Sequence, residues 1–226
     1  MRVSRQAGSC VLGALTLALV ITGCAAGRPG PEQQLEARAA YERGSSYVRE
    51  NKLTLALTAL QQAVKLDEQE PLYHNGLGIL YLHYLRRPDL ALTEFQRAAA
   101  LDSNNADAQY NMGIALAEMG MWADAIPAYQ RAIALPTLAT PQLAHNALGL
   151  AFYQVKRYRE AEEALRFAIS LEPKLEGAYY NLGLVFIAQD RKEEARIAFR
   201  QARTLAPESP FGQAALERLK ALGDGG

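Results

Sequence analysis

Small residues recur along this chain at nearly constant spacing, and this repetition limits the possible folds more than any other feature. Five glycines are separated by 34, 35, 36 and 34 residues: Gly44, Gly78, Gly113, Gly149 and Gly183. Two series of alanines follow the same spacing: Ala56, Ala91, Ala125, Ala161 and Ala195, then Ala63, Ala98, Ala132, Ala168 and Ala202. Two helices approach closely only where small side chains meet, because a larger residue pushes their axes apart. The spacing therefore predicts a solenoid of similar helical hairpins in which glycine packs against alanine.

The most regular copy runs from Glu176 to Pro207 and defines the rest of the pattern. Counted from Glu176, it has Tyr at position 4, Leu at 7, Gly at 8, Phe at 11, Ala at 20, Phe at 24, Ala at 27 and Pro at 32. This pattern resembles the tetratricopeptide repeat (TPR), a helical hairpin of about 34 residues. The resemblance implies an all-α fold, a TPR solenoid of about five helical hairpins plus a C-terminal capping helix.

We expect one array of repeats with short segments at both ends. The expected order is a lipoprotein signal peptide (1–23), a tether (24–30), the TPR array (31–209), a capping helix (210–222) and a disordered tail (223–226). The repeats are expected at 37–70, 71–105, 106–139, 142–175 and 176–209. Helical structure should begin near Pro31, since proline suits a first helical position. The second repeat carries one extra residue, which we place near Arg86–Asp89. Two prolines, Pro136 and Pro141, bound a lengthened connection where we expect a local change in the superhelical path.

The N-terminus has the features of an export signal. A basic start, Met1–Arg5, precedes an apolar run of 12 residues, Cys10–Ile21, which is too short to span a bilayer comfortably. The run ends in Ile21-Thr22-Gly23-Cys24, which resembles the lipobox of bacterial lipoproteins. In that class, cleavage precedes the cysteine and the cysteine receives the lipid. The resemblance implies that Cys24 is lipidated and becomes the mature N-terminus.

Two other fates of this segment stay open. Ordinary cleavage after Ala25 or Ala26 would leave a soluble exported protein, and an uncleaved signal would act as an anchor. Lipoproteins of double-membrane bacteria go to the outer membrane unless Asp follows the cysteine, and Ala25 follows it here. The resemblance therefore implies a lipid-anchored protein on the periplasmic face of the outer membrane.

Composition and motifs argue against a chemical site in the repeats. The 24 basic and 24 acidic residues balance, and no basic patch indicates nucleic acid as a partner. Both cysteines, Cys10 and Cys24, precede the repeats, so the array has no disulfide and no cysteine-based metal site. His74 and His145 share position 4, a packing position in the TPR family, and His83 alone is a weak ligand candidate. We expect no enzymatic activity, no cofactor, no metal and no small-molecule substrate.

The concave face carries the predicted binding site. In the TPR family it is lined by positions 2, 5, 9, 12 and 13 of each first helix. In this chain those positions are mainly aliphatic, with several tyrosines, two asparagine amides and few charges, and they include Leu82 and Gly177. The predicted partner-binding groove consists of Tyr41, Asn75, Ile79, Tyr110, Ile114, Asn146, Leu150, Tyr153, Tyr180 and Leu184.

An exposed apolar stripe of this length normally marks a site for a protein partner. We expect the tyrosines to contribute most to binding, and Asn75 and Asn146 to pair with the backbone of an extended or helical apolar segment. The alternative is that the array curls tightly, so that these residues pack only against one another.

The whole chain resembles the type IV pilus biogenesis lipoproteins, the pilotins, which share its lipobox, short tether, five or six repeats and proline-bounded connection. The resemblance is closest from Ala125 to Pro173. It departs from the family in having five repeats where six are usual, and in Leu138-Ala139, where an aromatic residue is often found. The resemblance implies an assembly factor that holds an apolar segment of an outer-membrane secretin subunit. The alternative is a general cell-envelope TPR scaffold that bridges other periplasmic or outer-membrane complexes.

Overall fold

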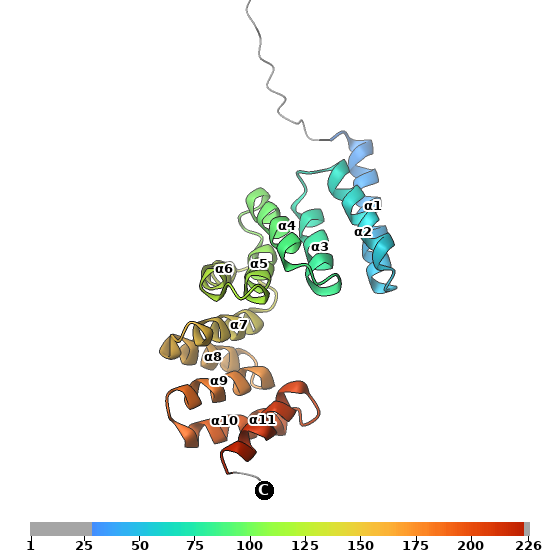
Figure 1. The fold of residues 1–226 in the computed structure, drawn as a ribbon. Coiled ribbons are helices and arrows are strands. Elements are labelled where there is room, and N and C mark those ends of the chain that lie inside the picture. The colour runs from blue at the N-terminus through green and yellow to red at the C-terminus, as the bar shows by residue number, and fades with distance from the viewer. Residues whose placement is uncertain (1–28, 224–226) are drawn as a thin grey trace, which may run out of the picture.

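The computed structural model describes residues 29–223, and all regular structure in that range is helical (Figure 1). It contains eleven α-helices and one π-helical turn. Their bounds are α1 Pro31–Arg49, α2 Leu53–Leu66, α3 Pro71–Ile79, η1 Leu80–Tyr84, α4 Pro88–Leu101, α5 Ala106–Glu118, α6 Trp122–Ala134, α7 Pro141–Gln154, α8 Tyr158–Leu171, α9 Glu176–Ala188, α10 Lys192–Leu205 and α11 Pro210–Ala221. The predicted signal peptide, the predicted lipidation site Cys24 and residues 224–226 of the predicted tail lie outside the described residues.

Consecutive helices pair into five hairpins, α1–α2, α3–α4, α5–α6, α7–α8 and α9–α10, and α11 packs against α10 and α9. In Figure 1 the hairpins stack into a curved array whose helices turn from steep in α1–α4 to nearly horizontal in α7–α10. This confirms the predicted TPR solenoid of five hairpins with a capping helix. Over residues 29–223, every helix is too short or too polar to cross a bilayer.

The predicted small residues form the interior of each hairpin. All ten alanines at positions 20 and 27 are 0% exposed. The glycines at position 8, however, do not pack mainly against these alanines as predicted. A methyl group on Gly113 would lie 2.5 Å from the Tyr129 ring, and the four other position-8 glycines likewise face the side chain at position 24. The glycine makes room for this large residue, because close packing requires that the space be filled.

Proline and left-handed residues set the ends of the helices. Five helices have proline at their first position, α1, α3, α4, α7 and α11, where the missing N–H costs no hydrogen bond. The turn inside each of the five hairpins contains one residue with positive φ, namely Asn51, Arg86, Gly120, Lys156 and Asp190. This backbone conformation ends the first helix of the hairpin and reverses the chain.

The extra residue of the second repeat lies inside the first helix, not near Arg86–Asp89 as predicted. Helix α3 widens into the π-helical turn η1, where the N–H of Leu85 donates to the carbonyl oxygen of Leu80 at 3.1 Å. Leu80 and Leu82 are both 0% exposed. The prediction that Leu82 lines the groove is therefore wrong, because the wider turn places its side chain in the core. Full burial of a leucine stabilises the fold by roughly 1.5–3 kcal/mol, which favours this arrangement over a longer loop.

The proline-bounded connection between α6 and α7 is part of the packing between the third and fourth repeats. Leu138 is only 8% exposed and belongs to a small apolar cluster with Ala106, Ala132 and Ala144. The hydroxyl of Thr137 donates to the carbonyl oxygen of Asn104 at 3.2 Å. Leu138 therefore anchors the connection against the third and fourth repeats, and the hydrogen bond of Thr137 ties it to the end of the second repeat.

An ion-pair network joins the fourth and fifth repeats on the outer side. Nη1 of Arg191 donates to Oε2 of Glu162, and Nη2 donates to Oε1 of Glu194, both at 2.5 Å. The Arg191 guanidinium lies 4.3 Å from the centre of the Phe186 ring. Burial opposes ionisation of Glu162, but the hydrogen bonds from Arg191 and Arg166 outweigh it, so the pKa of this carboxyl is lowered. The folded state therefore favours the ionised form of the Glu162 carboxyl group.

Candidate functional site

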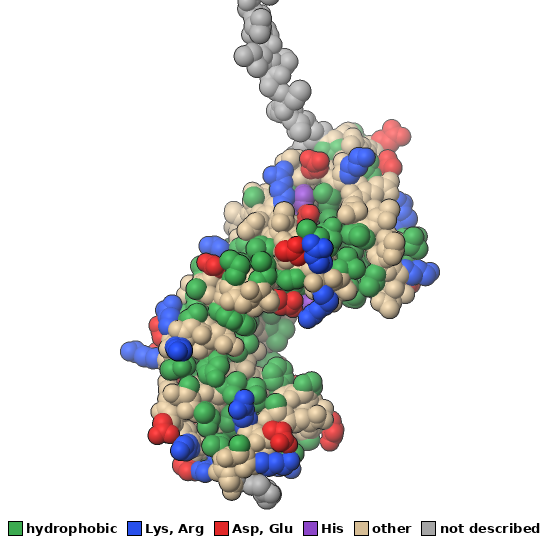
Figure 2. Space-filling view, in the orientation of Figure 1, with side chains coloured by type: hydrophobic (Ala, Val, Ile, Leu, Met, Phe, Trp, Pro, Cys, Tyr) green, Lys and Arg blue, Asp and Glu red, His purple; other side chains and the backbone are tan. Residues whose placement is uncertain are grey.

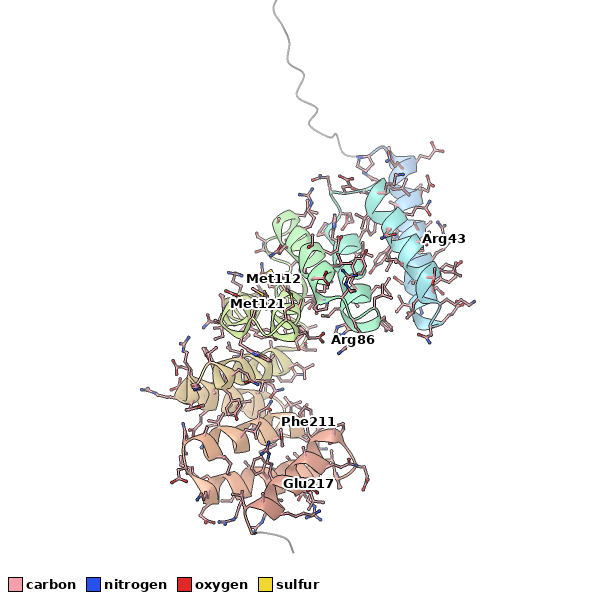
Figure 3. All side chains as sticks on the ribbon, in the orientation of Figure 1. Arg43, Arg86, Met112, Met121, Phe211 and Glu217 are labelled. Atoms are coloured by element: carbon pink, nitrogen blue, oxygen red, sulfur yellow. The ribbon has the colours of Figure 1, made fainter. Side chains whose placement is uncertain are left out.

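The concave side of the array is open. Figure 2 shows the surface hollowed between the upper repeats and the C-terminal end, with hydrophobic side chains on both walls. Arg86 and Phe211 lie on opposite sides of this hollow (Figure 3). Apolar residues at positions 2 and 12 stay accessible, with Leu72 48%, Leu143 37% and Ile187 38% exposed. The concave residues therefore do not close up against one another, as the tightly curled alternative requires.

All ten predicted groove residues are half-buried. Each is packed on one side against its own repeat or the next and keeps an accessible edge, as a residue positioned for contact with a partner should. Ile79, Tyr110, Ile114, Tyr153, Tyr180 and Leu184 pack directly against the main core cluster. The groove surface is thus continuous with the rigid interior of the solenoid, and a bound segment would meet side chains that are already ordered.

Each groove tyrosine is supported by a second aromatic ring. The ring centres of Tyr110 and Tyr129 are 5.9 Å apart, which is within the usual range for paired aromatic residues. Tyr41 pairs with Tyr73 at 5.3 Å, and Tyr153 pairs with Tyr158 at 6.0 Å. Burial raises the pKa of Tyr110 above its ordinary value, so its phenol stays neutral. Tyr110 therefore offers apolar area without charge.

Phe211 on the capping helix α11 forms a wall at the C-terminal end of the groove. Its ring centre lies 5.8 Å from that of Tyr180, which also pairs with Phe199 at 5.7 Å. Phe211 also covers Gly177, where an added methyl group would lie 3.0 Å from the ring. Gly177 was predicted to line the groove, and it is buried instead because the cap lies over it. The repeat pattern ends before α11 and so does not predict Phe211 as a groove residue.

The two groove asparagines are each held by an asparagine of the next repeat. Nδ2 of Asn111 donates to Oδ1 of Asn75 at 3.2 Å, and Nδ2 of Asn181 donates to Oδ1 of Asn146 at 3.0 Å. Asn111 and Asn181 are only 9% and 5% exposed. The groove pattern predicts the outer asparagines but not these inner ones. The spacing of the asparagines could have identified these partners, because they are 36 and 35 residues apart, which is one repeat length.

Charges lie mainly at the edges of the groove. Arg38 and Glu42 pair at 3.0 Å, and Arg86 and Glu118 pair at 3.9 Å, both between exposed or partly exposed side chains. Such pairs contribute little to stability, because solvent screens them. A partner of the groove therefore meets a nearly neutral surface with polar edges.

The two histidines at position 4, His74 and His145, are held by contacts within the fold. His74 is 6% exposed; its Nδ1 lies 2.7 Å from Oε2 of Glu94 and its Nε2 lies 3.2 Å from the carbonyl oxygen of Glu68. The ring of His145 packs at a tilt against Phe167 with ring centres 4.4 Å apart, and burial lowers the pKa of His145. His83 is exposed. Among residues 29–223, no three His, Cys, Asp or Glu side chains are grouped as a metal site requires.

A second depression lies on the outer side of the fourth and fifth repeats, with a volume of about 590 Å³. Helices α8, α9 and α10 form it, and the apolar residues that line it include Ile169, Leu182, Phe186 and Ile197. Ile197 is 66% exposed. This outer cleft provides a comparison surface for experiments on the concave groove.

Three protein-family models match the chain, and all describe the same repeat. Two described as "Tetratricopeptide repeat" match residues 146–210 and 106–135, and one described as "TPR repeat" matches 44–83 and 89–120. Together they match well over half of the chain. No curated protein sequence matches it.

The fold is similar to several solved structures. A MamA protein has a TM-score of 0.68 at 26% identity, with 76% of this chain and 93% of that chain covered. PilW, described as a widely conserved type IV pilus biogenesis factor, has a TM-score of 0.74 at 21% identity, with 83% and 86% covered. PilF of Pseudomonas aeruginosa has a TM-score of 0.71 at 20% identity, with 85% and 87% covered.

The family follows from three independent observations. The repeat models match along the array, the helices pair into five hairpins, and a similar fold occurs in YrrB, which is described as a TPR protein. The small residues of the repeat pattern occupy the buried positions that the repeat requires. The chain therefore belongs to the tetratricopeptide-repeat proteins.

Proposed function

We propose that this protein is a lipid-anchored assembly factor of the pilotin type. Anchored through Cys24 to the periplasmic face of the outer membrane, it holds an apolar segment of a type IV pilus secretin subunit and aids assembly of the secretin there. Two features support the proposal: the lipobox-like segment that ends at Cys24, and a fold similar to the pilus biogenesis factor PilW over 83% of the chain.

The observation that carries the binding role is the open, nearly uncharged groove. Its tyrosines rest on second aromatic rings, and Phe211 closes its C-terminal end. Rigid aromatic side chains give large contact area at a small entropic cost, which is the usual composition of a binding hot spot. A segment kept in this groove would have its apolar residues shielded from water until the subunit is inserted.

A general envelope scaffold is the second candidate. The observation that favours it is sequence identity: the two pilus proteins are 20–21% identical to this chain, no more than the MamA protein at 26%. In this case the groove would hold an apolar segment of another periplasmic or outer-membrane protein, and the secretin would assemble without it.

Co-expression distinguishes the two candidates. The full chain is expressed with the secretin subunit of the same genome in a double-membrane bacterial host that lacks its own type IV pili. Heat-resistant secretin multimers should appear in the outer-membrane fraction only with the full chain. They should be lost with Tyr110→Ala/Tyr180→Ala and kept with Ile197→Asp in the outer cleft. If the multimers form equally well without the chain, the pilotin function is ruled out and the general scaffold function remains.

A further inference from the structure

In the second, third and fourth repeats, the second helix covers the residue at position 4 of the first helix with one of its own side chains. The covering side chains are at position 23 or 26, and the pairs are Glu94 over His74, Arg131 over Gln109 and Phe167 over His145. The two polar pairs are 2.7 and 3.0 Å apart, and the ring centres of the aromatic pair are 4.4 Å apart. Each of these repeats therefore closes the same place on the outer side of its hairpin, although the chemistry of the contact differs.

The fifth repeat leaves this place open. Its position 4 is Tyr179 and its position 26 is Gln201, and both line the outer cleft of about 590 Å³. In the part of the chain that the structure describes, neither side chain makes a hydrogen bond, and Tyr179 is not paired with another ring. Gln201 is exposed and Tyr179 is half-buried. The outer cleft is therefore the space that Phe167 fills one repeat earlier.

Ile197 adds an exposed apolar side chain to the α10 wall of the cleft. It is 66% exposed, and position 22 in the other four repeats is occupied by Thr58, Thr93, Pro127 and Glu163. Ile169 is half-buried on the α8 wall, and the floor includes Leu182 and Phe186, which are 5% and 3% exposed. An accessible isoleucine beside an apolar depression indicates a contact site, because both surfaces leave water when a partner covers them.

One end of the cleft carries a row of alternating charges. The row runs from Arg166 on α8 through Glu162 and Arg191 to Glu194 on α10. It lies beside Phe186, since the guanidinium groups of Arg166 and Arg191 are 5.7 and 4.3 Å from the centre of that ring. The two end members are the most accessible, at 57% for Arg166 and 45% for Glu194. A partner therefore meets a positive charge on one wall and a negative charge on the other, and opposite charges on the partner would match them.

We propose that the outer cleft binds an amphipathic helix of a second protein partner. The helix presents an apolar stripe to Ile169 and Ile197, with an aromatic residue of this stripe over Tyr179. An acidic residue on one edge of the stripe faces Arg166, and a basic residue on the other edge faces Glu194. The inference goes beyond the proposed function, because none of the concave residues takes part in it.

The chemistry of the cleft selects a helix over an extended segment. Its walls and floor are helices whose main-chain groups are already bonded, so an extended segment would find partners for few of its N–H and C=O groups. The polar side chains away from the charged end are Ser170, Tyr179 and Gln201. A helix bonds its own main chain and packs between two helices with ridges in grooves. Tyr179 and Phe186 are two turns apart on α9, roughly 10 Å, so the bound helix makes contact over about three turns.

The first test selects ligands without assuming their conformation. Linear peptides of about 16 residues, enough for about four helical turns, are displayed on phage and selected on the full chain after binders of the Ile197→Asp variant have been removed. The control Thr58→Asp adds the same charge at position 22 of the first repeat, where the side chain is also exposed. Selected peptides should bind the wild type and Thr58→Asp equally, and Ile197→Asp at least about tenfold more weakly. They should be helical when bound, as judged by NMR. A library that yields no such peptide, or peptides that bind in an extended form, overturns the inference.

The second test fills the cleft from within the chain. In Gln201→Phe, the new ring should cover Tyr179 as Phe167 covers His145. The thermal midpoint should rise by about 2 °C or more, while the selected peptides bind at least about tenfold more weakly. Gln62→Phe is the matched control, because Gln62 is the exposed position-26 residue of a repeat whose position 4 is Ala40, which has no ring to cover. This control should bind the peptides as the wild type does, without a rise in midpoint. A Gln201→Phe variant that is stabilised and still binds the peptides normally shows that they do not enter the cleft.

The third test examines the charges. Arg166→Glu should weaken the binding of a selected peptide, and replacing the acidic residue of that peptide by lysine should restore binding to this variant and weaken it for the wild type. Such an exchange cannot come from a loss of folding. Affinities that ignore both reversals overturn the assigned charge pairing. Secretin multimers in the co-expression experiment depend on the concave groove, so their failure rejects the proposed function and leaves the outer cleft as a helix site.

Discussion

A methyl group on Gly149 would lie 2.5 Å from Cγ of Leu165, far inside van der Waals contact. Leu165 is 0% exposed and belongs to the main core, so it has no free space to move into. Position 8 therefore sets how closely the two helices of the hairpin approach, and the other four hairpins repeat the relationship.

Gly149→Leu should separate α7 from α8 and lower the free energy of unfolding by roughly 1–3 kcal/mol or more. Ala134→Leu, which also enlarges a residue but at an exposed helical position, is the matched control and should change it by less than about 0.5 kcal/mol. Urea unfolding followed by circular dichroism measures both. Equal stability of the two variants would contradict the packing described for position 8.

Glu162→Gln should make stability less dependent on pH. The folded state lowers the pKa of Glu162 below its usual 4.5, so its contribution is present above that value and is lost as pH falls through the folded pKa. At pH 7 the variant should be less stable than the wild type by about 1 kcal/mol, and the difference should shrink below pH 4.5. Glu163→Gln, at an exposed pair, should show no such difference. Urea unfolding of the wild type and the two variants at pH 7 and below pH 4.5 measures these differences. A stability difference between Glu162→Gln and the wild type that does not change with pH would contradict the role of the carboxylate.

Tyr110→Ala and Tyr180→Ala should each weaken binding of secretin-derived peptides by on the order of 1–2 kcal/mol. Affinity should change little with salt, because the groove has few charges to screen. Titration of the full chain at two salt concentrations measures both effects. Tyr180 lies between Phe199 and Phe211, so the stability of each variant must be measured alongside. Tyr110→Phe and Ile197→Asp are the controls and should bind normally. A strongly salt-dependent affinity would place the partner on the charged outer side.

Cys24 should carry several acyl chains in the mature protein. One chain gives only marginal membrane binding, whereas several on one cysteine give an essentially permanent anchor. Intact-mass measurement of protein purified from membranes should show a modified N-terminus at Cys24, and Cys24→Ser should release the protein from membranes. An unmodified N-terminus at Ala26 or Gly27 would support ordinary cleavage instead.

The repeat pattern predicts most of the fold because it records packing directly. The alanines of positions 20 and 27 and the glycines of position 8 identify the five hairpins, and Pro31 and Pro210 mark the first and last helices, as observed. The pattern does not reveal that Gly149 faces Leu165, because it fixes which residues are small but not which neighbour fills the space.

The details that sequence could not supply arise from geometry between elements. An extra residue fits either a loop or a helix, and the burial of Leu80 and Leu82 decides for the helix. Likewise, Asn111 and Asn181 reach Asn75 and Asn146 only through the stacking of successive repeats. The sequence predicts which residues face a partner, while the orientation of their polar groups depends on contacts one repeat away.

The π-helical turn shows how a solenoid can accommodate an extra residue within one helix. The widened turn η1 places Leu82 in the core, while the turn at Arg86 and the helix that begins at Pro88 keep the phase of the array. The next repeat is therefore undisturbed. Insertions and deletions inside a first helix give evolution a way to exchange the side chains lining one repeat in a single step, where point substitutions would change them one at a time.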